Sequence, residues 1–277
     1  MFIPEKNLIF NKCLDHRDPP FTAGETANLH RQESHAHDAR EILLVLKGKS
    51  GFYLNGKYFQ AAPGCAFFVD HWVAHQQGYP PDVGEIVHIW IHLHDSRMFA
   101  LPSIRGSRNQ DSGCTVWEFP DCMLQLVKSR WDKINSVPED LRSAYYSSIA
   151  RLLYEEICFQ CHFRKAGGSG EESIVSYVRN YIVMNHGRDS SMAELEKRTG
   201  YSRRHLMRCF KEEYSMTIGE YIDCVRRGFA ATAGERMMQK EIAFQLGFKS
   251  PAAYWLWKKR DQKKRSAQHR TTVQDPE

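Results

Sequence analysis

Residues 192–213 read Met-Ala-Glu-Leu-Glu-Lys-Arg-Thr-Gly-Tyr-Ser-Arg-Arg-His-Leu-Met-Arg-Cys-Phe-Lys-Glu-Glu, and this stretch decides the fold of the second half of the chain. It predicts a short helix, a turn at Gly200 and a second helix capped by Ser202. Leu206 and Phe210 fall on one face of that second helix, and the arginines fall on the opposite face. Such a helix can pack through one face and contact DNA through the other. A basic helical face alone is more often a solvated surface than a DNA-binding one. The neighbouring segments therefore have to show which of the two this helix is.

The segments on either side predict a domain built of helices. Apolar residues recur at helical spacing over residues 174–182, which indicates a first supporting helix. Ser191 with Glu194, and Thr217 with Glu220, each match a capping box, in which two side chains satisfy free N–H groups at a helix start. The sequence therefore predicts four helices in succession, and the basic face belongs to the third.

Further residues complete a family pattern: Leu195, Gly200, Ser202, Leu206, Phe210, Lys211, Glu212, Glu213, Glu220, Tyr221, Ile222, Arg226, Ile242, Ala243, Gly247, Phe248, Ser250, Tyr254, Lys259 and Arg270. With them, residues 172–270 resemble the DNA-binding domain of the AraC-type (AraC/XylS) transcription regulators. The resemblance implies an all-α domain with two helix-turn-helix units joined by a long helix. Their recognition helices would begin at Ser202 and Ser250 and enter successive major grooves of the duplex.

The chain departs from that family pattern at several positions. Glu196 replaces a small Ala against the turn, and residues 215–218 replace a Gly-x-Ser-Pro turn that supplies a positive φ. In the second unit, the usual Ser cap before Ile242 is missing, and the segment 226–247 is about two residues shorter than the family pattern. We therefore expect the first unit to make base contacts and the second to clamp the DNA backbone.

The positive charge lies in the C-terminal part of the chain. Residues 171–277 hold 20 Lys and Arg against 14 Asp and Glu, whereas residues 1–170 hold 18 against 19. A basic run from residue 258 onward suits phosphate neutralisation, and its alternative is a disordered, solubilising tail. The composition predicts order everywhere except in this tail beyond about residue 258. The candidate DNA-contacting residues are Ser202, Arg203, Arg204, Met207, Arg208, Lys211, Lys249, Ser250, Lys258 and Lys259.

The front half of the chain predicts many short strands. Asn55-Gly56 indicates a hairpin, Pro63-Gly64 another turn, residues 65–70 a strand, and residues 87–94 a strand with alternating faces. Evenly spaced short strands predict a small barrel or jelly roll. The fold class is therefore multidomain α+β, with a β-barrel, a helical hairpin and an all-α domain.

The pattern His35-x-His37, Glu41, Gly48 and His75 resembles the cupin barrel. In metal-binding cupins, three imidazoles and a carboxylate at these places suit iron, manganese, nickel or zinc. AraC-type regulators commonly carry a cupin-like effector domain with traces of these histidines and no catalytic duty. We therefore expect no metal, cofactor or catalytic residue, and a small polar ligand such as a sugar, with Trp72 or Trp90 offering a flat apolar face. The candidate effector-binding residues are His35, His37, Glu41, His75, Trp90 and His92.

Between the two halves, residues 121–136 and 138–162 predict two helices. The second has a wide apolar stripe, at Leu141, Tyr145, Ile149, Leu152, Leu153, Ile157 and Phe159, which would either pair with a second copy or cover the chain's own barrel. The Gly- and Ser-rich segment that follows predicts a flexible joint. The expected domains are residues 1–118 (effector-binding barrel), 119–165 (helical hairpin), 166–172 (linker) and 173–277 (DNA-binding domain).

Several function classes are not expected. Cys158-Phe-Gln-Cys161-His162 matches a haem attachment pattern, but that chemistry requires export, and the chain begins without a charged-then-apolar leader. The eight cysteines show no paired metal-ligand spacing and are expected to be reduced in a cytoplasmic protein. No apolar run approaches the length of a membrane span, so none is expected.

The sequence thus predicts a cytoplasmic, homodimeric, sequence-specific regulator of transcription that is not an enzyme. It would bind double-stranded operator DNA and a small-molecule effector, with RNA polymerase as a further partner, and the resembled family more often activates transcription. The alternatives are a metal-dependent cupin enzyme, of oxygenase or isomerase type, with a degenerate helical C-terminal domain, and a family member that binds a protein and no DNA.

Overall fold

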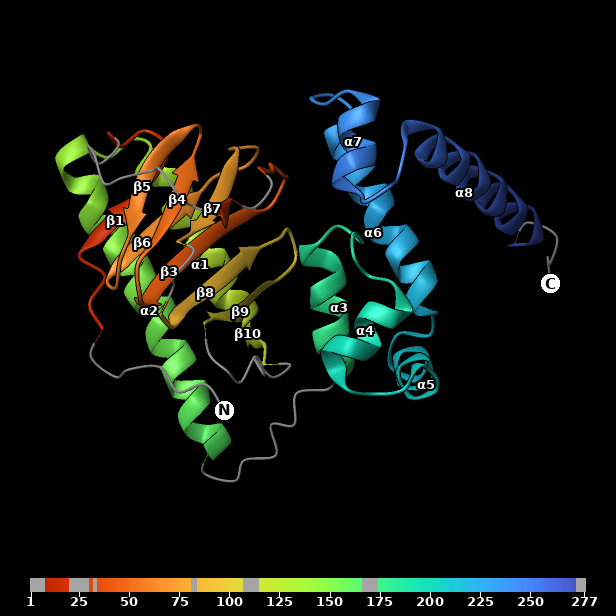
Figure 1. The fold of residues 1–277 in the computed structure, drawn as a ribbon, viewed down its shortest axis with the longest axis horizontal. Helices are drawn as coiled ribbons and strands as arrows, with labels where there is room; N and C mark the ends of the chain where they lie inside the picture. Colours follow the sequence, from red (N-terminus) through yellow and green to blue (C-terminus); the bar gives the residue numbers. More distant parts are fainter. Residues whose placement is uncertain are drawn as a thin grey trace. The chain divides into compact units, whose positions relative to one another are not determined.

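A computed structural model describes residues 8–19, 30–31, 34–80, 84–106, 115–165 and 174–272, and within these ranges the chain forms ten strands and eight helices (Figure 1). It folds into two compact units, residues 1–173 and 174–277. No helix among the described residues is long and apolar enough to cross a membrane. The linker expected at residues 166–172 lies outside the described residues.

The strands of the first unit form two sheets. The six-stranded sheet has the order β1 (Lys12–Leu14), β6 (Cys65–Val69), β3 (Arg40–Lys47), β8 (Ile86–Leu93), β9 (Met98–Arg105) and β10 (Trp117–Phe119). The four-stranded sheet has the order β2 (His30–Arg31), β7 (His75–Tyr79), β4 (Ser50–Leu54) and β5 (Lys57–Ala61). Neighbouring strands are antiparallel, except that β1 runs parallel to β6. Apolar side chains from both sheets share one core, so the sheets face each other.

The turn chemistry of the sequence explains how the strands are connected. Asn55 and Gly56 join β4 to β5 with φ values of 50° and 77°, the left-handed conformation that this hairpin turn requires. Gly64 precedes β6 with a φ of 85°. The predicted alternation along β8 is confirmed, because Ile89 and Ile91 pack in the core that the helices share, and Trp90 packs against the core between the sheets.

Helices α1 (Asp121–Ile134) and α2 (Glu139–Lys165) cover one face of the six-stranded sheet (Figure 1). Both helices were expected, and α2 extends three residues beyond the predicted end at residue 162. The wide apolar stripe of α2 divides into two parts. Ile149, Leu153 and Ile157 are fully buried against the sheet, whereas Leu141, Tyr145, Phe159 and Phe163 are exposed. The outer part of the stripe therefore has no cover within the described residues.

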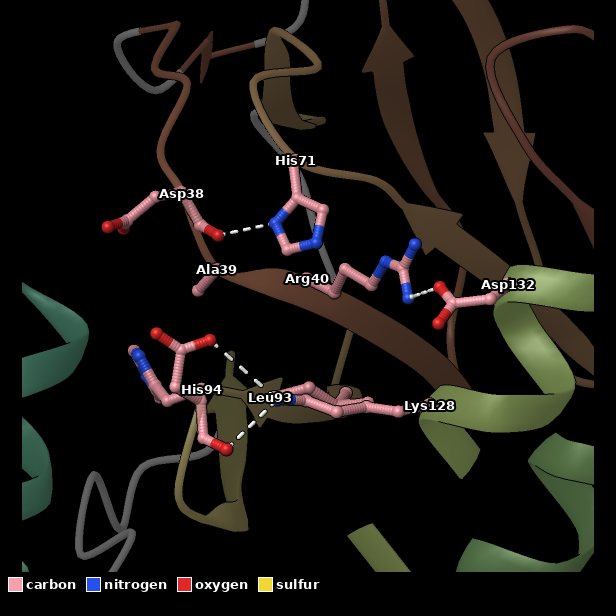
Figure 2. A pocket seen from close by; sticks show the side chains of 9 residues that line it. Asp38, Ala39, Arg40, His71, Leu93, His94, Lys128 and Asp132 are labelled. Atoms are coloured by element: carbon pink, nitrogen blue, oxygen red, sulfur yellow. Dashed lines mark hydrogen bonds and ion pairs between the residues drawn. The ribbon is translucent and has the colours of Figure 1, made fainter. Parts of the chain in front are cut away.

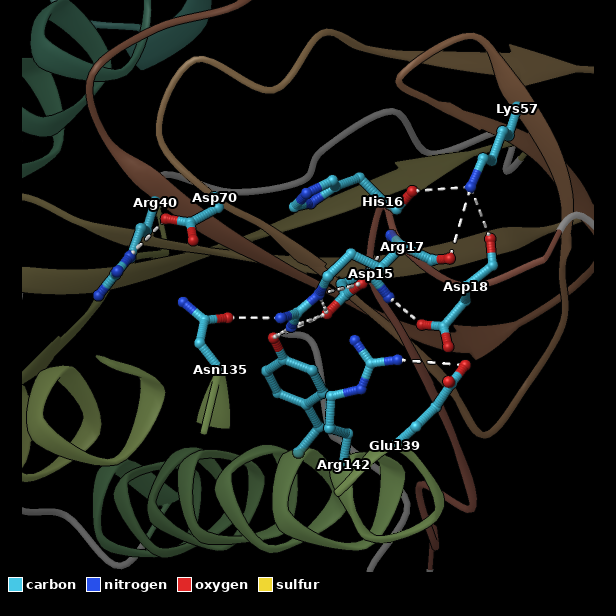
Figure 3. A network of polar contacts seen from close by, with 11 residues as sticks. Asp15, His16, Arg17, Asp18, Arg40, Lys57, Asp70, Asn135, Glu139 and Arg142 are labelled. Carbon is cyan, nitrogen blue, oxygen red and sulfur yellow. Dashed lines mark hydrogen bonds and ion pairs between the residues drawn. The ribbon is translucent and has the colours of Figure 1, made fainter. Parts of the chain in front are cut away.

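A polar network attaches the first strand to the two helices (Figure 3). The buried carboxylate of Asp15 is paired with the guanidinium of Arg17 and accepts a hydrogen bond from Tyr146 Oη at 3.0 Å. Arg17 also donates to the side-chain oxygen of Asn135 in the loop after α1. Burial opposes ionisation of Asp15, but the hydrogen bonds from Arg17 outweigh it and lower the pKa of this carboxyl. The network joins residues more than 100 positions apart.

Helices alone build the second unit, and their bounds are α3 (Ile174–Met184), α4 (Met192–Thr199), α5 (Arg203–Tyr214), α6 (Ile218–Ala233), α7 (Gln239–Gln245) and α8 (Pro251–Thr272). The predicted caps are present, since Ser191, Ser202 and Thr217 each accept a hydrogen bond from the backbone N–H three residues on. At Thr217 the backbone N–H donates in return to the Glu220 carboxylate, which completes the predicted capping box. At Ser191 only the hydroxyl cap forms, because the Glu194 carboxylate pairs with Arg198 at 2.7 Å. The predicted supporting helix is α3, with Tyr181 and Ile182 among its buried residues.

The expectation of a disordered tail beyond about residue 258 is wrong, because α8 continues to Thr272. Tyr254 and Trp257 are buried, and Asp261, only 6% exposed, forms an ion pair with Arg227 of α6. The indole N–H of Trp257 donates to Asp223 of α6 at 2.7 Å. These contacts attach one face of α8 to α6, so the helix is set by tertiary packing that a charge count does not detect.

Two departures from the family pattern have a structural explanation. The carboxylate of Glu196 accepts a hydrogen bond from the backbone N–H of Arg203 at 2.7 Å, so it supplements the Ser202 cap at the start of α5. Ser215 occupies the left-handed C-cap of α5 with a φ of 55°, where the family has glycine.

Replacing Ser215 by Gly is expected to stabilise the second unit by about 0.5–1 kcal/mol, because glycine adopts this conformation without steric cost. The matched change is Gly200→Ala, which introduces a Cβ at a φ of 72° and should destabilise by about 1–2 kcal/mol. No atom lies within 4 Å of that added Cβ, so the effect would come from the backbone alone. Thermal unfolding by circular dichroism measures both, and shifts of equal sign would contradict the explanation.

Candidate functional site

The first candidate site lies at one end of the two facing sheets, where four segments of the chain meet. Glu41 is the second residue of β3, and His92 of β8 is its register partner. His75 begins β7 and pairs through two backbone hydrogen bonds, of 3.1 and 2.9 Å, with His35. His37 lies between His35 and β3. Antiparallel pairing therefore brings together residues that are up to 57 positions apart in the sequence.

Three imidazoles surround the carboxylate of Glu41. Its Oε1 lies 3.1 Å from His37 Nε2 and 2.8 Å from His92 Nδ1, and its Oε2 lies 3.1 Å from His75 Nε2. All four of these residues are at most 4% exposed, whereas His35 at the edge is half-buried. We call His35, His37, Glu41, His75 and His92 the histidine cluster.

The charge state of the cluster follows from this geometry. Burial opposes ionisation of Glu41, but the charges of His37 and His92 and the hydrogen bonds to its oxygens hold the pKa of this carboxyl well below its usual range. Burial likewise opposes protonation of His37, and the facing Glu41 carboxylate outweighs that effect and raises the pKa of His37. Glu41 and His37 are therefore a buried pair in which each side chain favours the charged form of the other.

Backbone carbonyls set the orientation of two of these imidazoles. His37 Nδ1 lies 3.0 Å from the carbonyl of Ala39, and His75 Nδ1 lies 2.9 Å from the carbonyl of Val73. Because a carbonyl only accepts hydrogen bonds, each Nδ1 carries a proton, and each Nε2 faces Glu41. Each short Nε2 to carboxylate contact then needs a proton or a metal cation between the two atoms.

The donor set fits a divalent transition metal. The ligand atoms of His35, His37, Glu41 and His75 lie within 4.8 Å of one another. Three imidazoles with one carboxylate suit iron, manganese or zinc, and the carbonyls behind His37 and His75 supply the outer hydrogen bonds that fix ligating histidines. His92 would then orient Glu41 from behind.

Aromatic rings form the wall beside the cluster. The ring of Trp90, half-buried, lies 6.3 Å from that of His75 and 6.0 Å from that of Phe52. The structure thus brings together all six residues predicted to bind an effector. Trp72, the other candidate for a flat face, donates its backbone N–H to the His37 carbonyl at 2.8 Å.

Comparison with known protein families identifies this part of the chain. Residues 21–141 match the AraC-like ligand binding domain. The match includes the whole histidine cluster, the strands that position it and helix α1. A search of the curated proteins finds none that matches the chain. The first unit is therefore similar, over these residues, to the AraC-like ligand binding domain.

The ligand-binding domain also has a polar pocket of about 200 Å³ that sequence reasoning missed (Figure 2). Its lining residues are Asp38, Ala39, Arg40, His71, Leu93, His94, Asp95, Lys128 and Asp132. Arg40 pairs with Asp70 at 2.7 Å and with Asp132 of α1 at 2.6 Å, so its charge is already neutralised. Individually these side chains resemble ordinary surface charges, and only the fold of β3 and β8 beside α1 brings them together.

Two further histidines, the buried His88 of β8 and the half-buried His94 that follows it, are held neutral. Burial lowers the pKa of His88 to about 3, with the charge of Arg105 adding to the effect. Burial also lowers the pKa of His94 to about 3, assisted by the nearby His92. Gln77 donates its amide N–H to His88 Nδ1. Neither side chain gains a carboxylate partner of the kind that Glu41 offers the cluster.

These two histidines predict a loss of stability in acid. The unfolded chain takes up a proton at each histidine near pH 6.5, and the folded chain resists it down to about pH 3, so stability falls as pH falls through that interval. His88→Gln should remove about 1.4 kcal/mol per pH unit from this dependence. Urea denaturation between pH 7 and 5 measures the slope, with exposed His162→Gln as the control. An unchanged slope in His88→Gln would contradict the assignment.

The second candidate site is the outer face of α5 in the second unit. Leu206 and Phe210 are 1% exposed and hold the helix on its neighbours. Arg203 and Arg204 are exposed, and their side chains form no hydrogen bond or ion pair with any described residue. Arg208 is also exposed but donates to both oxygens of Glu212, at 3.0 Å each. The structure places all ten candidate DNA-contacting residues at the surface.

Proposed function

We propose that the chain is a sequence-specific DNA-binding transcription regulator, not an enzyme, that responds to a small molecule in its ligand-binding domain. The observation that carries the proposal is the free basic face of α5. Arg203 and Arg204 extend from a helix whose other face is buried, so their positions are fixed while their donors stay available. A guanidinium can donate two hydrogen bonds to guanine O6 and N7 or grip a phosphate.

In this proposal, α4, the turn at Gly200 and α5 act as the first helix-turn-helix unit. Arg203, Arg204 and Arg208 read bases or grip phosphates, and Lys211 neutralises a phosphate. Helices α7 and α8 form the second helix-turn-helix unit. Ser250 caps α8 by accepting a hydrogen bond from the backbone N–H of Ala253 at 3.2 Å. Lys249 precedes the start of α8, Lys258 and Lys259 lie about two turns into it, and all three are exposed and suit the DNA backbone.

The effector in this proposal is a small polar metabolite such as a sugar. The histidine cluster supplies hydrogen-bonding groups, and Trp90 supplies a flat apolar face beside them. Occupancy of the site would shift the population of DNA-binding states, because the effector would bind one state better than the other.

We further propose that the regulator is a cytoplasmic homodimer that contacts RNA polymerase. The outer face of α2 carries four apolar residues that are 45–57% exposed, namely Leu141, Tyr145, Phe159 and Phe163. The ring centres of Phe159 and Phe163 lie 4.5 Å apart. A second copy of α2 would cover this face, and a two-fold dimer suits repeated half-sites on DNA.

A selection of random duplex oligonucleotides on the full chain tests the function. The expected result is enrichment of one sequence with repeated half-sites, whose affinity falls steeply as salt is raised. If no sequence is enriched above the starting pool at low salt, the proposal is overturned.

A second candidate function is a metal-dependent enzyme, and the four-ligand geometry of the histidine cluster favours it. His35, His37, Glu41 and His75 would hold the metal, which when bound supplies a Lewis acid with open coordination positions. His92 would keep Glu41 oriented through its 2.8 Å contact.

Metal analysis of the purified chain separates the two functions. Stoichiometric iron, manganese or zinc that is lost when His35 and His75 are replaced together, in a chain that binds no duplex, favours the enzyme. Metal-free protein that retards selected duplexes favours the regulator.

A further inference from the structure

The outward side of α8 carries two large apolar residues, although the helix lies in the most basic segment of the chain. Tyr254, Trp257 and Asp261 are buried and define the inner face. Trp255 and Leu256 fall on the other side of the helix and are 53% and 55% exposed. An exposed aromatic and an exposed aliphatic residue at consecutive positions on the outward side of a helix have the composition of a contact surface.

The outward residues of α8 differ in chemistry from those at the corresponding positions of α5. Both helices follow a serine cap, Ser202 and Ser250, so their positions correspond at an offset of 48 residues. The outward positions of α5 and their counterparts in α8 are Arg204 and Ala252, Met207 and Trp255, Arg208 and Leu256, and Lys211 and Lys259. Two guanidinium groups are thus replaced by side chains that cannot form hydrogen bonds with a base edge or a phosphate.

The surroundings of this face are complementary to a polyanion. Lys258, Lys259, Arg260 and Lys263 are exposed along α8, and Lys249 precedes its cap. The ammonium group of Lys259 lies 4.3 Å from the centre of the Trp255 ring, so charge borders the apolar surface directly. An apolar protein groove would have to accept these ammonium groups without a counterion, whereas DNA presents a row of phosphates on either side of its groove.

We infer that Trp255 and Leu256 contact the 5-methyl groups of thymine in the major groove. The second helix-turn-helix unit would then recognise thymine bases by apolar contact. The inference rests on the proposed DNA-binding function and deepens it. The thymine methyl is the one apolar group that the bases expose in that groove, and it distinguishes A·T from T·A as well as from G·C. In this division of labour, α5 reads hydrogen-bonding groups and α8 reads methyl groups.

The fixed position of α8 supports such a readout. The 2.7 Å bond from Trp257 to Asp223 and the ion pair between Asp261 and Arg227 attach the helix to α6 on its inner side. A short-range apolar contact needs this rigidity, because it is lost with a displacement of about 1 Å.

The experiment uses the full chain and the duplex that random-oligonucleotide selection enriches on it. The same duplex is made with deoxyuridine in place of thymine, which removes only the methyl groups and keeps the base pairs. The wild-type chain is expected to bind the deoxyuridine duplex about fourfold more weakly for each buried methyl lost. A Trp255→Ala, Leu256→Ala double variant should bind both duplexes equally.

Phe244→Ala is the matched control. Phe244 is an exposed apolar residue of the neighbouring helix α7, and the Arg188 guanidinium lies 5.0 Å from the centre of its ring. This variant should retain the full preference for thymine. Because Trp255 and Leu256 are more than half exposed, the double variant should also unfold at the wild-type temperature.

The inference is overturned if the wild-type chain binds thymine and deoxyuridine duplexes equally, or if the double variant keeps the preference. A double variant that binds both duplexes as tightly as wild type binds thymine would assign the face to a protein partner instead. If one of these results is obtained while Arg204→Ala still weakens DNA binding, the thymine readout by α8 is rejected and the proposed DNA-binding function stands. If wild type enriches no duplex, the proposed function fails with it.

Discussion

Arg204→Ala is expected to weaken binding to the selected duplex by about 5- to 150-fold, or about 1–3 kcal/mol, with the loss concentrated on one base pair. Arg204 is exposed on α5 and its side chain has no partner among the described residues. Its donors are therefore available to a base edge without breaking an internal contact. Fluorescence anisotropy at fixed salt, on the selected duplex and its single-base variants, measures the effect.

Two further variants interpret that result. Arg151→Ala removes an exposed guanidinium that pairs with Glu155 on α2, and it should leave DNA affinity unchanged. Lys211→Ala should weaken binding to all sequences alike and reduce the slope of log affinity against log salt by about one. If Arg204→Ala weakens binding to all sequences equally, Arg204 contacts a phosphate and not a base. If the affinity is unchanged, Arg204 lies outside the interface.

Glu41→Gln is expected to lower the free energy of unfolding of the first unit by about 3–5 kcal/mol, because it leaves buried imidazoles without their charge partner. The carboxylate is 4% exposed and faces His37, His75 and His92 at 2.8–3.1 Å. Glutamine has nearly the same volume, so the loss would report charge and hydrogen bonding, not a cavity. Urea denaturation followed by tryptophan fluorescence measures it, with and without a chelator.

The sign of its pH dependence follows from the lowered pKa of Glu41. The carboxylate contributes its stability above the unfolded value near 4.5 and loses that contribution as pH falls through its lower folded pKa. The gap between wild type and Glu41→Gln should therefore narrow in acid. Glu85→Gln, which breaks an exposed pair with Lys47, should cost less than about 1 kcal/mol. A similarly small cost for Glu41→Gln would show that the cluster tolerates loss of its anion.

Local chemistry made much of the fold predictable. Ser202 and Thr217 cap helices because a side-chain oxygen placed there satisfies a free N–H, and Asn55-Gly56 turns because both residues adopt positive φ. These features depend on neighbours within four residues. The helical periodicity over residues 174–182 likewise predicted α3 with its buried face.

Features that depend on distant partners were not predictable. The continuation of α8 to Thr272 depends on contacts of its inner face with α6, and charge alone indicated disorder. Glu196 departs from the family pattern, and only the structure shows that its carboxylate accepts a hydrogen bond from Arg203 N at the start of α5. The six effector-site candidates were chosen from a resemblance, and the distribution of His37, His75 and His92 around one carboxylate became visible only with the strand register.

The attachment of β1 has a consequence for how the chain folds during synthesis on the ribosome. This strand lies parallel to β6, and its following loop is held by the hydroxyl of Tyr146, 131 positions away, while Ser147 donates to the carbonyl of Phe10. The carboxylate of Asp15 and the carbonyl of Phe10 must therefore wait for the middle of α2 to be synthesised before they gain these partners. During that interval β1 can pair only with β6, and a chaperone that covers the segment before α2 docks would find its longest opportunity there.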